Sequence, residues 1–156
     1  MNKRGTKSAG YHYLECGLRN IYLSNGYHEI DTPYGKATSV EDVEGLHHVI
    51  ATTLVYEKPH LTGPEFRFLR KELGLSQKSF AQLIGKTEQA VALWEKTGRI
   101  QKWAEMILRK LFIEEKINDN TKLKEMIERI NNLDRIMNEK IYFALGKTSG
   151  SWSLAA

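Results

Sequence analysis

The stretch SQKSFAQLIGKTEQAVALWEK, residues 76–96, constrains the fold of this chain most strongly. Ser76 is a favourable N-cap, and the apolar residues that follow it recur at the spacing of one helical face: Phe80, Leu83 and Ile84. Gly85 suits a tight turn because glycine tolerates positive φ. Thr87 can cap a second helix, and the apolar residues on the inner side of that helix are Val91 and Trp94. The stretch therefore predicts two short helices joined by a brief turn.

The spacing of small residues indicates how these two helices meet. Helices joined by so short a turn cross steeply, so the first needs a small side chain at the crossing, which Ala81 supplies. Ala81, Gly85 and Val91 stand at spacings of four and six, as a helix-turn-helix requires. An ordinary helical hairpin is the alternative. Apolar helical patterns on both sides favour the helix-turn-helix; their inward residues are predicted to be Phe66, Leu69 and Leu73 before it and Trp103, Ile107, Leu108 and Leu111 after it.

Residues 69–98, LRKELGLSQKSFAQLIGKTEQAVALWEKTG, resemble the Cro/repressor-type (Xre) helix-turn-helix family. The resemblance implies a compact bundle of four or five helices that binds double-stranded DNA. In that family an arginine on the first helix commonly pairs with the glutamate of the WE dipeptide, and the matching residues here are Arg70 and Glu95. The residues expected to hold the helix-turn-helix together are Ala81, Gly85, Val91, Trp94, Arg70 and Glu95.

The resemblance also implies which side chains contact DNA. It places Gln77 at the DNA backbone and the edge of the site. Gln89 can pair bidentately with adenine, Glu88 can accept from cytosine, and Leu93 can contact a thymine methyl group. Glu88 and Leu93 depart from the family, which usually has a polar or basic residue at the position of Leu93. The predicted base-contacting residues are Gln77, Thr87, Glu88, Gln89 and Leu93, and the predicted phosphate-contacting residues are Ser76, Lys78, Lys86, Lys96 and Arg99.

The charge distribution agrees with a DNA-binding role for this region. The chain has a net charge of +4. Residues 11–56 carry two basic and six acidic residues, whereas residues 57–116 carry twelve basic and eight acidic residues. A basic surface is what contact with phosphates requires. Residues 1–10 are expected to be a flexible basic tail, and the alternative is an arm that reaches DNA.

The segments outside the helix-turn-helix are less specific. In residues 11–58 the pattern predicts a β-hairpin turning at Asn25-Gly26 and then a helix that opens at Ser39, together a dimer or partner segment. Residues 59–116 are predicted to be the Xre-type domain. Residues 117–156 are predicted to be an amphipathic helix that includes Ile141, followed by a loose tail in which Trp152 could dock. The expected fold class is mainly α: a helical bundle with a small N-terminal hairpin and a C-terminal helix.

The single cysteine, Cys16, excludes an internal disulfide and a zinc site built from several cysteines. The layout of residues 11–112, with ECGL and YLSNGY ahead of TGPEFRFLRKELGLSQ, is similar to the MqsA-type antitoxins and related regulators. Those proteins carry an N-terminal zinc-binding segment, so this chain resembles a zinc-free relative. No metal and no other cofactor is expected.

Two functions follow from these patterns. The first is a sequence-specific bacterial repressor that binds a pseudo-palindromic operator as a homodimer, because one module reads too little DNA for tight binding. The second is an antitoxin that neutralises a partner toxin and represses its own operon. An enzyme is not expected, since the sequence has no nucleophile elbow, phosphate-binding loop or cluster of metal ligands. No membrane span or export signal is evident, so a cytoplasmic location is expected.

Overall fold

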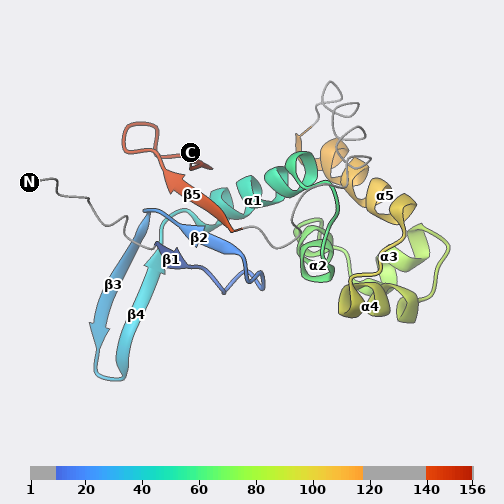
Figure 1. Cartoon of the computed structure of the whole chain (residues 1–156), viewed down its shortest axis with the longest axis horizontal. Helices are drawn as coiled ribbons and strands as arrows, with labels where there is room; N and C mark the ends of the chain where they lie inside the picture. Colours follow the sequence, from blue (N-terminus) through green and yellow to red (C-terminus); the bar gives the residue numbers. More distant parts are fainter. Residues whose placement is uncertain (1–9, 118–139, 156) are drawn as a thin grey trace, which may run out of the picture.

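The structure, a computed structural model, describes residues 10–117 and 140–155. Its strands are β1 (Tyr11–His12), β2 (Ile21–Leu23), β3 (Tyr27–Thr32), β4 (Gly35–Val40), β5 (Ile141–Leu145) and β6 (Trp152–Leu154). Its helices are α1 (Val43–Glu57), α2 (Gly63–Glu72), α3 (Gln77–Leu83), α4 (Glu88–Thr97), α5 (Lys102–Phe112) and the π-helical turn η1 (Ile113–Ile117). The strands lie at one end of the molecule and α2–α5 at the other, with α1 between them (Figure 1).

Strands from both ends of the chain form one sheet, in the order β1-β2-β5-β6. β2 runs parallel to β5, with Ile21 opposite Ile141 and Leu23 opposite Phe143, and the other pairs are antiparallel. Ile21, Leu23 and Phe143 are completely buried. The expected fold class is therefore corrected from mainly α to mixed α/β.

The C-terminal residues pack as part of this sheet. Ile141 begins a strand and does not belong to a helix, and Trp152, in the expected tail, is buried and donates a hydrogen bond from Nε1 to the Glu41 carbonyl oxygen at 2.9 Å. Paired strands satisfy backbone hydrogen bonds that a loose tail would leave to water. The amphipathic helix predicted before Ile141 falls largely on residues 118–139, which lie outside the described residues.

The hairpin predicted to turn at Asn25-Gly26 is wrong, because the strand before that turn, β2, pairs with β1 and β5 and not with β3. β3 pairs with β4 in a two-stranded ribbon that turns at residues 33–34 and projects from the sheet (Figure 1). The Asn25 amide instead continues the bonding of β2 to β5, because it donates to the Leu145 carbonyl oxygen at 3.0 Å and accepts from the Leu145 N–H. β4 also includes Ser39, so α1 begins later than expected, with Asp42 as the N-cap.

Helix α1 joins the sheet to the helical bundle. Its side chains Leu46, Ile50 and Leu54 are completely buried. At its C-terminal end the buried guanidinium of Arg109, on α5, donates from Nη1 to the carbonyl oxygens of Leu54 and Val55 at 3.0 and 2.7 Å. A cation at this position satisfies carbonyl groups that a helix end leaves without partners. The contact fixes α1 against α5.

Three apolar residues expected inside the bundle lie nearer the surface. Leu83 is 63% exposed, Trp103 is 36% exposed and Ile107 is 37% exposed. In α3 the buried residues are Phe80 and Ala81, so the direction facing the core lies between them. Leu83 is then about 110° away from that direction, at 100° per residue. The three-residue spacing from Phe80 to Leu83 was therefore a misleading sign of a shared face.

Candidate nucleic-acid interface

Both helices of the helix-turn-helix begin at side-chain caps. Ser76 Oγ accepts a hydrogen bond from the Ser79 N–H at 2.9 Å, and Thr87 Oγ1 accepts one from the Ala90 N–H at 3.2 Å. These bonds satisfy N–H groups that a helix start would otherwise leave unpaired. α4 ends at Gly98, which adopts a left-handed conformation and donates to the Trp94 carbonyl oxygen at 2.8 Å. The caps fix both ends of α4 and the start of α3.

The turn and the core fix the crossing of α3 and α4. Gly85 has a φ of 67°, the left-handed conformation that the tight turn needs. Ala81 on α3 and Val91 on α4 are buried. The ring of Phe66, from α2, packs edge-on against both Phe80 and Trp94, at centroid distances of 5.5 and 6.4 Å. Aromatic packing of this kind adds to the energy of burial, so α2 supports the two helices from behind.

A buried polar cluster joins α2 to α4. Arg70 donates from Nε to Glu95 Oε1 at 2.6 Å and from Nη2 to Oε2 at 3.1 Å, and its Nη1 donates to the Leu75 carbonyl oxygen at 2.7 Å. The side chains of Arg70 and Glu95 are 7% and 5% exposed. Gln77 Nε2 also donates to Glu95 Oε2 at 2.7 Å. The two residues that the resemblance pairs are thus in contact, and Gln77 is partly committed to the same cluster.

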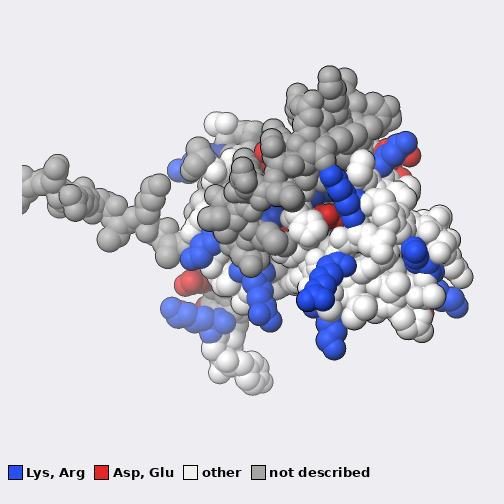
Figure 2. Space-filling model, turned by 45° about the vertical axis from the view of Figure 1, so that its right-hand side comes forward, with Lys and Arg blue, Asp and Glu red and all other residues white. Residues whose placement is uncertain are grey.

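The packing leaves one face of α4 exposed to solvent. Leu93 is 57% exposed, and the residues predicted to contact DNA are likewise exposed, except for the half-buried Gln77; the exposed ones are Ser76, Lys78, Lys86, Thr87, Glu88, Gln89, Leu93, Lys96 and Arg99. Lys86 Nζ lies 5.5 Å from the ring centroid of Trp103, a cation–π distance. The helix-turn-helix side of the molecule in Figure 2 carries Lys and Arg side chains with few acidic ones between them.

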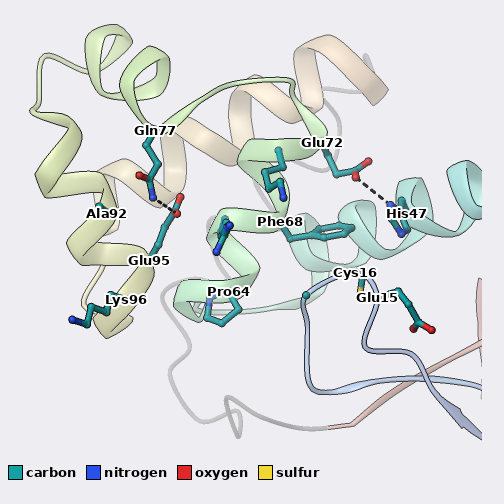
Figure 3. A pocket seen from close by; sticks show the side chains of 13 residues that line it. Glu15, Cys16, His47, Pro64, Phe68, Glu72, Gln77, Ala92, Glu95 and Lys96 are labelled. Atoms are coloured by element: carbon teal, nitrogen blue, oxygen red, sulfur yellow. Dashed lines mark hydrogen bonds and ion pairs between the residues drawn. The ribbon is translucent and has the colours of Figure 1, made fainter.

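A groove of about 640 Å³ lies beside α4 (Figure 3). Its walls come from the loop after β1, from α1 and α2, from the start of α3, and from the middle and C-terminal part of α4. The side chains and backbone that line it belong to Glu15, Cys16, Gly17, His47, Pro64, Arg67, Phe68, Lys71, Glu72, Gln77, Ala92, Glu95 and Lys96. Arg67 and Lys71 are not among the residues predicted from the sequence to contact DNA. The sequence does show that Pro64, Arg67, Phe68 and Lys71 recur at helical spacing. These residues therefore lie on one face of α2, distinct from its apolar face.

The ionisable groups that line the groove include the Cys16 thiol and a contact between Glu72 and His47. Burial raises the pKa of the Cys16 thiol from 9.0 to about 11, so it stays protonated and weakly nucleophilic at neutral pH. Glu72 contacts His47 Nδ1 at 3.3 Å. Across residues 10–117 and 140–155, no three His, Cys, Asp or Glu side chains gather in a way that could hold a metal ion. The same residues include no helix long and apolar enough to cross a membrane.

Comparison with known proteins bears on this region of the chain. Residues 66–100 match a family model described as helix-turn-helix. The match confirms a Cro/repressor-type helix-turn-helix in this segment, and domains of that family are DNA-binding regulatory domains. Searches of curated proteins and of solved structures found no match. The similarity to MqsA-type antitoxins stays a prediction.

Proposed function

We propose that this protein is a sequence-specific transcriptional repressor that binds a pseudo-palindromic operator as a homodimer in the bacterial cytoplasm. The observation that carries the proposal is the exposed face of α4, rigidly held by the caps and by the Arg70–Glu95 pair. A major groove admits one α-helix, and a helix with fixed orientation can present the same side chains to every half-site. Occupation of an operator that overlaps a promoter would block transcription.

In this proposal the side chains of α4 divide into two roles. Gln89 pairs with adenine, Glu88 accepts from cytosine, and Leu93 contacts a thymine methyl group, with about 1–3 kcal/mol of discrimination for a good bidentate contact. Thr87 and Gln77 lie at the margin of the base contacts. The phosphate-binding residues set register without reading sequence, and they are Ser76, Lys78, Lys86, Lys96 and Arg99. The N-termini of the capped helices add N–H donors for phosphate oxygens.

The proposal is tested by binding of the purified protein to DNA from upstream of its own gene. We expect tight binding at two chains per site, with an affinity that falls steeply as salt rises. Gln89→Ala should relax preference at one base position in each half-site. Gln82→Ala, an exposed glutamine on α3, is the matched control and should bind as the parent protein does. If Gln89→Ala left the binding to every operator variant as it is in the parent protein, the assignment of α4 to the groove would be contradicted.

A second candidate function is that of an antitoxin, and the β3–β4 ribbon favours it. The ribbon carries Ile30, which is 52% exposed, and Tyr34 at its tip, which is fully exposed. Exposed apolar side chains on a projecting element are typical of protein contact sites. The test is co-expression with the product of the adjacent gene. We expect the two proteins to form a complex. The double variant Ile30→Ser/Tyr34→Ser should weaken this complex, and the control Leu83→Ser should not. If no complex forms, the antitoxin function is contradicted and only the repressor function remains.

A further inference from the structure

Arg67 and Lys71 lie one turn apart on α2 and line the same groove. Both side chains are exposed, and within residues 10–117 and 140–155 neither has a hydrogen bond or ion pair. The carboxylates of the same wall are already engaged, since Glu95 binds Arg70 and Glu72 contacts His47. Neither Arg67 nor Lys71 forms an ion pair with these carboxylates.

The groove is continuous with the surface that reads DNA. Ala92 and Lys96 of α4 and Gln77 at the start of α3 line it together with Arg67 and Lys71. In Figure 3 Gln77, Glu95 and Lys96 follow one another along the wall made by α3 and α4. Across the groove, Glu15 accepts a hydrogen bond from the Tyr11 hydroxyl and belongs to the loop after β1. An anion that runs past Gln77 and Lys96 therefore meets Arg67 and Lys71 on α2.

We propose that Arg67 and Lys71 bind phosphates of the operator backbone outside the base pairs read by α4, so that each half-site is longer than the helix-turn-helix alone would require. The inference rests on the proposed function and extends it to the flanking DNA. The guanidinium of Arg67 can hold a phosphate bidentately, and the ammonium of Lys71 can hold a neighbouring one as a point charge. These contacts add affinity and fix register but read no base.

The test compares the double variant Arg67→Ala/Lys71→Ala with the parent on two operator duplexes, one with flanking base pairs and one trimmed to the bases that α4 reads. The slope of log K against log salt is negative, and the loss of two phosphate contacts per chain should reduce its magnitude by about 1.8 per half-site. Trimming should weaken the parent protein by the same factor as the double substitution, and it should not weaken the variant further. The matched control is Lys36→Ala/Lys147→Ala, which removes two exposed lysines from β4 and from the β5–β6 loop and should keep the parental slope.

The outcomes separate the inference from the proposed function. A parent protein that binds no DNA specifically would overturn the proposed function. A parent that binds its operator, with a variant that keeps the parental slope and the parental response to trimming, would overturn only the inference. Inorganic phosphate serves as the probe for a free anion: if it raises the melting temperature of the parent but not of the variant, while both bind DNA equally, the groove takes a small phosphorylated molecule and the DNA assignment is wrong.

Discussion

Arg70 and Glu95 join α2 to α4 through two hydrogen bonds of 2.6 and 3.1 Å between side chains that are almost completely buried. The geometry is the bidentate one in which a guanidinium and a carboxylate fit best. Because Glu95 lies on the inner side of α4, this pair fixes how the outer side is turned. A contact inside the bundle thus determines where Gln89 and Leu93 point.

We predict that Arg70→Met destabilises the protein by about 3–5 kcal/mol, because it leaves the buried carboxylate of Glu95 without its cation. Urea unfolding followed by circular dichroism measures this change. Arg67→Met removes an arginine from the exposed face of the same helix and should change stability little. The double variant Arg70→Met/Glu95→Leu should recover part of the loss, and no recovery would show that packing matters more than the stranded charge.

A second prediction concerns the contact of α2 with the end of α4. A Cβ atom at Gly63 would fall on the backbone carbonyl of Glu95. Gly63→Ala should therefore force the two helices apart and cost about 3 kcal/mol, the upper end of overpacking costs. Gly74→Ala is the control, because Gly74 has a φ of 68° and open space around it. That change should cost only the strain of a left-handed alanine, about 1–2 kcal/mol, and equal losses at both positions would contradict the proposed clash.

The helix-turn-helix could be predicted from sequence because its determinants are local. Caps at Ser76 and Thr87, the turn at Gly85 and the small residue Ala81 all lie within twenty residues of one another, and each requires a particular residue type. The exposed face of α4 follows directly from which residues are buried. Sequence rules of this kind agree with the fold wherever the residues in contact are close together in the sequence.

The sheet could not be predicted because its pairing is long-range. β2 needs β5 as its partner, more than a hundred residues later, and no local pattern at Ile21 or Leu23 identifies that partner. Asn25-Gly26 has the composition of a hairpin turn, yet the Asn25 amide bonds to Leu145. The role proposed for Arg67 and Lys71 could not be predicted for a related reason. In the sequence they look like ordinary solvent-exposed residues of a helix, and only the fold places α4 and the loop after β1 around the same groove.

The third prediction concerns stability against pH at Glu65. Burial raises the pKa of this carboxyl above 4.5, and Lys58, 3.6 Å away, only partly opposes the shift. The folded state therefore holds the proton more tightly than the unfolded chain. The stability that this proton supplies is present below pH 4.5 and is lost as pH rises through the higher folded pKa.

Glu65→Gln tests this pH dependence. Glutamine keeps the acceptor for the Thr62 N–H, which Glu65 Oε1 now accepts at 3.1 Å in the capping box. In urea titrations from pH 4.5 to 7, the variant should gain stability relative to the parent as pH rises above 4.5 and should stop gaining once pH has passed the folded pKa of Glu65. A Glu65→Gln difference that stays constant over that range would mean that the folded and unfolded Glu65 carboxyls titrate alike.

The last prediction concerns the reactivity of Cys16. Burial raises the pKa of its thiol from 9.0 to about 11, and its Sγ lies 3.6 Å from the Tyr13 carbonyl oxygen as a weak donor. Only the thiolate reacts with alkylating reagents, so two pKa units lower the reactive fraction at pH 8 by about 100-fold. Iodoacetamide should therefore label the folded chain about 100-fold more slowly than the urea-unfolded chain, as followed by mass spectrometry.

The dependence of that rate on pH separates ionisation from shielding. If the raised pKa is the cause, the labelling rate of the folded chain should climb about tenfold for each pH unit from 7 to 10, with no plateau near 9.0. Steric shielding alone would lower the rate by a constant factor and leave the plateau where an ordinary thiol has it. Pro64→Ala, which opens the opposite wall of the groove, should raise the rate if access limits it and leave it unchanged if ionisation does. A folded chain that is labelled as fast as the unfolded chain, with a plateau near 9.0, would contradict both explanations and place Cys16 in a more open environment than the groove beside α2.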